Sequence, residues 1–106
     1  MGLLDFFRIP DINEGVRQFA GTPGSVLLDV RTREEYRQGH VPGSRNLPVE
    51  EIAGINGLVS ATATPLLVYC WSGARSRMAA GRLRRMGYQN VTNIGGINRY
   101  RGKVEY

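Results

Sequence analysis

The sequence lacks the features that mark secreted and membrane-spanning proteins. Its 106 residues contain a single cysteine, so no disulfide can close within the chain. No apolar run approaches the ~20 residues that span a bilayer, and residues 1–7 have neither the basic start nor the cleavage site of a signal peptide. We therefore expect a cytoplasmic protein with no membrane partner. The length and the 42% hydrophobic content predict one globular domain over residues 1–106, with its core at about 9–100.

Acidic residues are scarce relative to basic ones, nine against fourteen, which gives a net charge of +5. Thirteen of the basic residues are arginine; they are spread along the chain, with one cluster at Arg82, Arg84 and Arg85. No basic motif interleaved with aromatic residues occurs, so we do not expect nucleic acid as a partner. The charge instead predicts solubility and a positive field around the functional site.

Short apolar runs alternate with helical patterns along the whole chain. The predicted strands are residues 6–9, 25–30, 45–47, 65–69 and 91–94. The predicted helical segments are residues 12–19, 33–38, 49–55, 76–86 and 97–101. Asp11 is a predicted N-cap, and Thr32 with Glu35 forms a predicted capping box. This alternation predicts an α/β fold with a parallel sheet and helices on both faces.

Three loops are expected to meet at one edge of this sheet. Cys70 follows one predicted strand, the segment Arg31–Glu35 follows another, and the predicted tight turn Gly95-Gly96 follows a third. In parallel sheets ligands bind beyond the carboxyl ends of the strands. We therefore treat these three loops as one site.

Cys70 stands where a predicted buried strand stops, and a short loop containing Gly73 leads from it into a helix. So short a loop must curl tightly, which turns successive backbone N–H groups inward and makes an anion-binding nest. The helix dipole and Arg75 add positive potential, and each of these contributions favours the thiolate. The sequence thus predicts a nucleophilic thiol, at the rim of the loop, that works on or carries something negative. The alternative is that Cys70 is a small buried apolar residue.

Several segments together resemble the single-domain rhodaneses, which are sulfurtransferases of the thiosulfate sulfurtransferase type. The segments are Leu28-Asp29-Val30-Arg31, Glu35-Tyr36, Gly39-His40-Val41-Pro42-Gly43-Ser44, Asn46-Leu47-Pro48, Tyr69-Cys70-Trp71-Ser72-Gly73-Ala74-Arg75-Ser76 and Asn93-Ile94-Gly95-Gly96-Ile97. They run in order from about Ile9 to Tyr100. The resemblance implies a rhodanese-like α/β fold, with a five-stranded, mostly parallel sheet flanked by helices on both faces.

The resemblance also implies an activity. Cys70 would take a sulfane sulfur from thiosulfate or a persulfide donor, carry it as a persulfide, and pass it to a thiophilic acceptor, cyanide in vitro and thiols in cells. A small anionic donor, a thiol acceptor and a sulfur-relay protein are the implied partners. The reaction needs no cofactor and no metal, because it consists of two sulfur transfers through a covalent intermediate.

Roles for individual residues follow from the resemblance. The implied substrate-binding loop is Trp71, Ser72, Gly73, Ala74, Arg75 and Ser76, and the supporting residues are Asp29, Arg31 and Glu35. Gly73 is expected at positive φ. Arg75 would attract the anionic donor, or else point into solvent, and Trp71 would line the rim, or else serve only in packing. The supporting residues would mainly brace loops by ion pairs, and His40 would belong to a structural corner rather than act as a base.

Two other functions compete with sulfur transfer. Phosphatases and arsenate reductases also place a cysteine before a curled loop and an arginine, but with five residues between them. Here four residues separate Cys70 from Arg75, which makes a cup that suits sulfur better than phosphate. The second alternative is a sulfur-relay or regulatory protein-binding module, which the presence of Cys70 disfavours.

Overall fold

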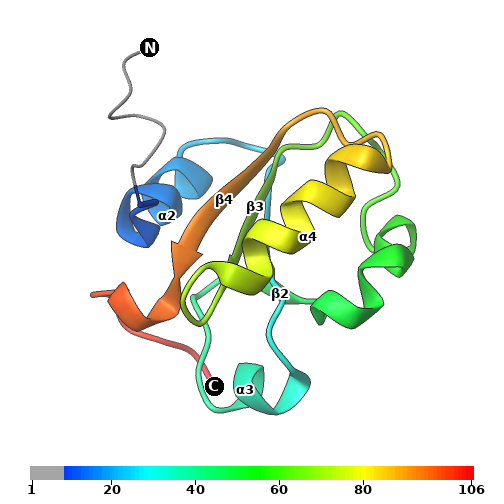
Figure 1. The fold of residues 1–106 in the computed structure, drawn as a ribbon. Helices are drawn as coiled ribbons and strands as arrows, with labels where there is room; N and C mark the ends of the chain where they lie inside the picture. The colour runs from blue at the N-terminus through cyan, green and yellow to red at the C-terminus, as the bar shows by residue number, and fades with distance from the viewer. Residues whose placement is uncertain (1–8) are drawn as a thin grey trace.

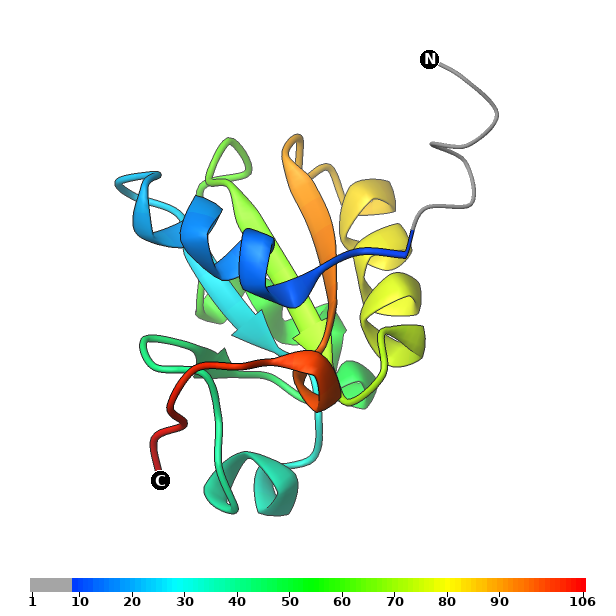
Figure 2. The same cartoon turned by 90° about the vertical axis from the view of Figure 1, so that its left-hand side faces the viewer.

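The computed structural model describes residues 9–106 as a four-stranded parallel sheet with helices on both faces (Figure 1). The strands are β1 (Val26–Asp29), β2 (Arg45–Asn46), β3 (Leu66–Cys70) and β4 (Val91–Gly96). The α-helices are α2 (Ile12–Ala20), α3 (Arg33–Arg37) and α4 (Ala74–Arg85), and the 3-10 helices are η1 (Val49–Gly57) and η2 (Ile97–Arg99). The predicted α/β architecture, a parallel sheet with helices on both faces (Figure 2), is confirmed.

In the strand order β2-β1-β3-β4, the topological switch point lies between β1 and β3. The chain leaves β1 for β2 at one edge, then returns to β3 on the other side of β1. In open parallel sheets the crevice for ligands forms at such a switch point, beyond the carboxyl ends of the two strands. Here those ends are Asp29 and Cys70, which places the predicted loops on one edge.

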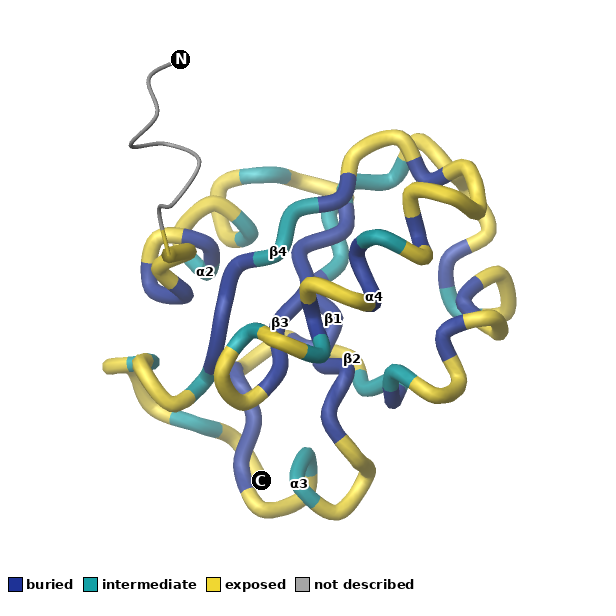
Figure 3. Tube along the Cα trace, in the orientation of Figure 1, coloured by how far each residue is buried: buried dark blue, intermediate teal, exposed yellow. Residues whose placement is uncertain are grey.

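Two apolar clusters cover the two faces of the sheet. Side chains of alternate residues point to opposite faces of a strand, so Val68 and Cys70 join the cluster under α4 and η1, whereas Leu67 and Tyr69 join the cluster under α2. Figure 2 shows α2 on one face of the sheet and α4 on the other. All five residues of β3 are buried, and the buried stretches of Figure 3 follow the strands through the centre of the molecule. β3 therefore holds Cys70 on a rigid base.

The structure differs from the sequence-based expectations in several elements. The sheet has four strands in the described residues. The fifth strand was predicted at residues 6–9, of which 6–8 lie outside the described range, and Ile9 is not in a strand. Gly95-Gly96, predicted as a tight turn, is the end of β4. α4 begins at Ala74 rather than at residue 76, and the segment 49–57 is a 3-10 helix.

The sequence predicts that Met78, Ala79, Leu83 and Met86 form the apolar side of α4, but the buried side is narrower. Ala79 and Leu83 are buried, whereas Met78 is 56% exposed and Met86 39% exposed. The face of α4 that meets the sheet is filled by Ser76 and small alanines, so the helix lies close to β3 and β4 and its longer apolar side chains fall outside the contact. Within the part of the chain that the structure describes, no helix has the length and apolar character required to cross a membrane.

Candidate active site

The loop after β3 curls around the sulfur of Cys70. Gly73 adopts φ 105°, the left-handed conformation predicted for it, and serves as the N-cap of α4. This conformation turns the Gly73 N–H inward, and its nitrogen lies 3.0 Å from Cys70 Sγ. The hydroxyl of Ser76, in the first turn of α4, lies 3.5 Å from the same sulfur. The sulfur is thus held between an amide donor and a hydroxyl at the start of a 12-residue helix.

These donors change the acidity of the thiol. Burial by itself raises the pKa of Cys70, because a charged sulfur is costly in an apolar environment. Hydrogen bonds from the Ser76 side chain and from the backbone of Ser76, Gly73 and Ser72 act in the opposite direction and lower the pKa. The net shift is downward, as the sequence predicted from an inward-facing nest of amides.

The thiol lies at the floor of the loop rather than at its rim. Cys70 is 1% exposed, because it is the last residue of a fully buried strand and the loop folds back over it. Trp71 and Ser72 are exposed above it, and Ala74, the first residue of α4, is exposed as well. A reactant must therefore reach the sulfur through the mouth of the loop.

Asn93 connects the loop, the helix and β4, a role that sequence reasoning did not assign to it. Its Oδ1 accepts hydrogen bonds from the Gly95 backbone N–H at 3.1 Å and from the Ser76 hydroxyl at 2.7 Å. Its Nδ2 lies 3.4 Å from the Gly73 carbonyl oxygen. Because the Gly95 N–H can only donate, the atom of Asn93 that faces it must be the oxygen. The one signal available was an amide residue inside a strand, where asparagine is depleted.

The Ser76 hydroxyl has one proton and three acceptors within reach. They are Asn93 Oδ1 at 2.7 Å, the Gly73 carbonyl oxygen at 3.1 Å and Cys70 Sγ at 3.5 Å. A neutral thiol is a weak acceptor, whereas a charged sulfur makes a charge-assisted hydrogen bond roughly twice as strong as a neutral one. If the proton turns toward a charged sulfur, Asn93 Oδ1 keeps the hydrogen bond from Gly95 and is not left unpaired.

Gly95 and Gly96, at the end of β4, lie next to the Cys70 loop. The register between β3 and β4 shifts after Val68, so that Cys70 pairs with Gly96. A Cβ on Gly96 would collide with the Trp71 carbonyl oxygen and lie 2.6 Å from the Cα of Ser72. Only a residue without a side chain lets the loop lie this close to β4. The two glycines, which we expected to form a turn, instead end β4, and Gly96 lets the loop pack directly against the strand.

Arg75 forms a bidentate ion pair with Glu35 of α3. The distances are 2.7 Å between Nη1 and Oε1 and 3.0 Å between Nη2 and Oε2. This contact lowers the pKa of Glu35 from 4.5 to about 2, although burial acts in the opposite direction. Glu35 also completes the predicted capping box with Thr32. Arg75 therefore does not extend freely into solvent: its side chain is 34% exposed, and its charge is matched by Glu35.

Asp29 and Arg31 brace the end of β1, as the sequence predicted. Asp29 is fully buried, and its Oδ2 lies 2.7 Å from Nη2 of Arg31. The same Nη2 donates to the carbonyl oxygen of Gly39 at 2.7 Å, which ties the end of β1 to the corner after α3. Glu35 and Arg31 do not pair with each other here, since Glu35 faces Arg75 and Arg31 faces Asp29.

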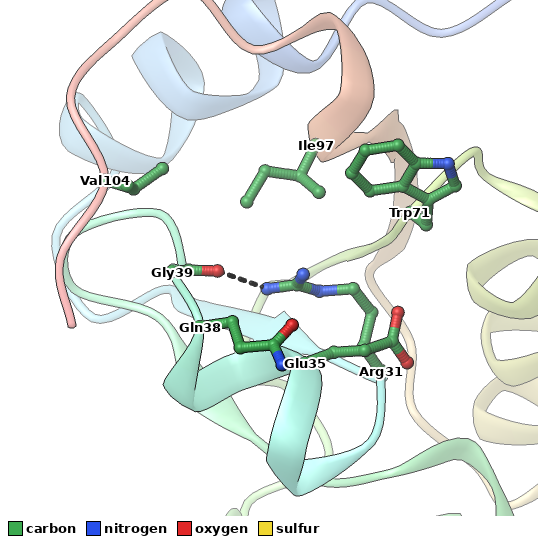
Figure 4. A pocket seen from close by; sticks show the side chains of 7 residues that line it. All are labelled: Arg31, Glu35, Gln38, Gly39, Trp71, Ile97 and Val104. Atoms are coloured by element: carbon green, nitrogen blue, oxygen red, sulfur yellow. Dashed lines mark hydrogen bonds between the residues drawn. The ribbon is translucent and has the colours of Figure 1, made fainter.

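A cavity of about 330 Å³ opens beside the loop (Figure 4). The residues that line it are Arg31, Glu35, Gln38, Gly39, Trp71, Ile97 and Val104. Trp71, the residue that follows Cys70, is 54% exposed and forms one wall. The cavity thus adjoins the loop through Trp71 on one side and through Glu35, the partner of Arg75, on the other. No group of three or more side chains suited to hold a metal ion occurs among residues 9–106.

The sequence model of the rhodanese-like domain family matches residues 13–103 of this chain. Thiosulfate sulfurtransferase PspE of Escherichia coli is 40% identical over 75 residues, which are 66% of this chain and 68% of PspE. The putative sulfur carrier protein YrkF of Bacillus subtilis is 33% identical over 100 residues, and the chain spans only 54% of its length. A solved structure described as a rhodanese with anions from E. coli superposes with a TM-score of 0.71 at 34% identity, over 76% of this chain and 96% of that one.

Proposed function

This chain belongs to the rhodanese-like domain family, and we propose that it acts as a sulfurtransferase with Cys70 as the sulfur carrier. The names of two relatives, a thiosulfate sulfurtransferase and a putative sulfur carrier protein, support this reaction class. The donor we propose is thiosulfate or another persulfide-forming compound. The acceptor we propose is a thiol, with cyanide as a substitute in assays.

One observation carries the proposal: the sulfur of Cys70 lies between two hydrogen-bond donors. The Gly73 nitrogen is 3.0 Å away, and the Ser76 hydroxyl oxygen is 3.5 Å away. Such donors stabilise a negative charge on the sulfur. A cysteine that served only in packing would not require them.

The first transfer loads the protein. The thiolate of Cys70 attacks the outer sulfur of thiosulfate, the bond between the two sulfur atoms of the donor breaks, and sulfite leaves with the bonding electron pair. One S–S bond forms and one breaks, so no external oxidant or reductant is needed. The product is an anionic persulfide on Cys70, which the loop amides and the Ser76 hydroxyl are placed to stabilise.

The second transfer discharges it. A thiolate or cyanide attacks the outer sulfur of the persulfide, and the S–S bond to Cys70 breaks. Cys70 leaves as a thiolate. It is a good leaving group because its pKa is lowered. The protein returns to its starting state after each cycle.

Intact mass spectrometry tests the proposal directly. After incubation with thiosulfate and removal of excess donor, the protein should carry one added sulfur atom, and the variant Cys70→Ser should carry none. Subsequent addition of cyanide should remove the sulfur and release thiocyanate. A protein that gains no sulfur from thiosulfate or from an organic persulfide would refute the proposal.

The same preparation tests the competing functions. A phosphatase of related loop design would release phosphate from a phosphomonoester and would form no thiocyanate. We expect thiocyanate and no phosphate, because four rather than five residues separate Cys70 from Arg75. A regulatory module would bind a partner without ever gaining sulfur.

Sulfur exchange with a protein is a second candidate function, and the surface of α4 favours it. This helix carries five arginines and no acidic residue. Next to it, a groove of about 360 Å³ is lined by Ile52, Ala53, Arg82, Arg85 and Met86. A negatively charged sulfur-relay protein fits this surface by charge. For the double variant R82E/R85E, we expect the rate of loading from a persulfidated cysteine desulfurase to fall relative to the rate of loading from thiosulfate.

A further inference from the structure

Val104 lines the cavity on the side opposite α3, and it belongs to residues 100–106, which run back along the molecule after η2 (Figure 2). This segment is held at one end by Asn13 of α2. The Arg101 backbone N–H donates to Asn13 Oδ1 at 2.9 Å, and Asn13 Nδ2 donates to the Arg99 carbonyl oxygen at 3.0 Å. The segment therefore leaves η2 in a fixed direction.

The other end of the segment is held at the corner after α3. His40 and Glu105 exchange two backbone hydrogen bonds, of 2.9 Å and 2.8 Å. His40 is itself fixed by a hydrogen bond to the Tyr36 carbonyl oxygen and by stacking on the Tyr36 ring. Between the two anchors, Val104 packs over Gly39, where a Cβ would lie 3.2 Å from a Val104 methyl group. Val104 is thus presented to the cavity by a segment tied down on both sides (Figure 4).

The charges at this cavity are already matched within the protein. Its two charged lining residues are Arg31, which pairs with Asp29, and Glu35, which pairs with Arg75. Among residues 9–106, no buried side-chain nitrogen or oxygen lacks a hydrogen-bond partner. A ligand therefore finds no unmatched charge to bind here.

The apolar lining residues lie together along one side of the cavity. In Figure 4 Val104, Ile97 and Trp71 form a row on that side, and the polar side chains that line the cavity lie on the other. Thiosulfate is a small dianion with no apolar part, and it gains nothing from such walls. A second substrate that carries an apolar group would bury it here.

We propose that this cavity is the acceptor site and that the acceptor is a small thiol bearing an apolar group, which Trp71, Ile97 and Val104 contact. The proposal rests on the sulfur transfer proposed above. The acceptor thiolate attacks the outer sulfur of the Cys70 persulfide and takes it as R–S–S⁻. The S–S bond to Cys70 breaks and Cys70 leaves as a thiolate, so the charge and the electron count are the same on both sides.

Discharge of preloaded protein tests the acceptor class. Protein carrying one sulfur is mixed with benzyl mercaptan or with 2-mercaptoethanol, two thiols of similar acidity, and loss of the sulfur is followed by mass spectrometry. At concentrations below saturation we expect benzyl mercaptan to react roughly tenfold faster, because its ring is removed from water in the cavity. In Val104→Asn the ratio of the two rates should fall several-fold, whereas in the control Lys103→Asn, an exposed residue of the same segment outside the cavity lining, it should stay unchanged.

Trp71 is the only tryptophan of the chain, so its fluorescence reports occupancy of the cavity without any reaction. Titration with benzyl methyl sulfide, which cannot accept sulfur, should change the emission of the wild type and of Lys103→Asn, and should require several-fold higher concentrations in Val104→Asn. Equal discharge by the two thiols, or an emission that does not respond, would overturn the acceptor-site proposal. If the protein never takes up sulfur from any donor while the emission still responds, the sulfurtransferase proposal fails and the cavity stands as a binding site.

Discussion

Glu35 and Arg75 form a bidentate ion pair across the switch point between β1 and β3, although they are 40 residues apart in the sequence. Glu35 belongs to α3, which follows β1, and Arg75 belongs to the first turn of α4, which follows the loop of Cys70. The pair holds the loop against α3. It also neutralises the charge of Arg75, the basic residue closest in sequence to Cys70.

This pairing predicts that a neutral residue at position 35 speeds up loading from thiosulfate. In Glu35→Gln the side chain can still accept one hydrogen bond from Arg75 and keep the capping box with Thr32, but the charge of Arg75 is no longer matched. We expect the second-order rate constant for loading to rise about three- to tenfold at low ionic strength, and the gain to shrink with added salt. Rapid mixing followed by mass spectrometry measures it.

Glu34→Gln is the matched control, since it makes the same charge change on the same helix at an exposed position outside the cavity lining. Its loading rate should rise much less than that of Glu35→Gln. Equal gains in both variants would mean that only the net charge of the protein matters, and not the ion pair.

The same pair predicts a loss of stability in acid. The Arg75 hydrogen bonds lower the pKa of Glu35 from 4.5 to about 2 in the folded protein. A carboxylate with a lowered pKa contributes stability above its unfolded-state pKa, and this contribution is lost as the pH falls through the folded-state value. The Glu35 side chain is 31% exposed, so solvent screening limits the contribution to roughly 1 kcal/mol.

Urea unfolding of the wild type and of Glu35→Gln measures this contribution. The free energy of unfolding of the wild type should exceed that of the variant by roughly 1 kcal/mol at about pH 6, and the two should converge near pH 2. A difference that stays constant over the whole range would show that the carboxylate charge is not its origin.

The parts of the site that could be predicted from the sequence depend on local signals. The capping box of Thr32 and Glu35 and the left-handed conformation of Gly73 each follow from a few neighbouring residues. The meeting of the loops after β1 and β3 follows from parallel topology alone. These features were predicted before any side chain was placed.

The parts that could not be predicted depend on distant contacts. Nothing local distinguishes Glu35 as the partner of Arg75, because the chain has thirteen arginines and Arg31 lies nearer in sequence. Gly95-Gly96 fits a turn by composition, and only the approach of Pro10 to Gly95 and of the loop to Gly96 shows why these positions lack side chains. The wall formed by Val104 requires two anchors on other elements, at Asn13 and His40.

A methyl group at Gly96 is predicted to lift the loop from β4. In Gly96→Ala the new Cβ would meet the Trp71 carbonyl oxygen and the Cα of Ser72, which are backbone atoms that can move only with the loop. We expect the free energy of unfolding to fall by about 1–3 kcal/mol and sulfur loading to slow at least tenfold, roughly the effect of displacing an oriented donor. Thermal melts and loading rates measure the two effects.

Gly54→Ala is the control for this change, because a Cβ at Gly54 of η1 meets no atom within 4 Å. It should load sulfur at the wild-type rate and melt at a temperature no lower than that of the wild type. A wild-type rate of sulfur loading in a folded Gly96→Ala protein would show that the reactivity of Cys70 does not depend on the close packing of the loop against β4.

Asn93 is predicted to set the acidity of Cys70 through Ser76. The charged groups at this end of the sheet, Arg75 with Glu35 and Arg31 with Asp29, stay the same in every variant compared. In Asn93→Ala the Ser76 hydroxyl loses its closest acceptor, at 2.7 Å, and its proton becomes available to Cys70 Sγ. We expect the pKa of the thiol to fall below that of the wild type, as measured from the ultraviolet absorbance of the thiolate across pH.

The double variant distinguishes this competition from a general disturbance of β4. In Ser76→Ala, which has no hydroxyl to redirect, the further change Asn93→Ala should leave the pKa of Cys70 where it is. Asn93→Val, which suits a strand and also lacks an acceptor, should lower the pKa as Asn93→Ala does, and the exposed Asn90→Ala should not change it. An equal shift with and without the Ser76 hydroxyl would mean that Asn93 acts by holding the backbone of Gly95 and Gly73 in place, because both backgrounds lose those two contacts alike.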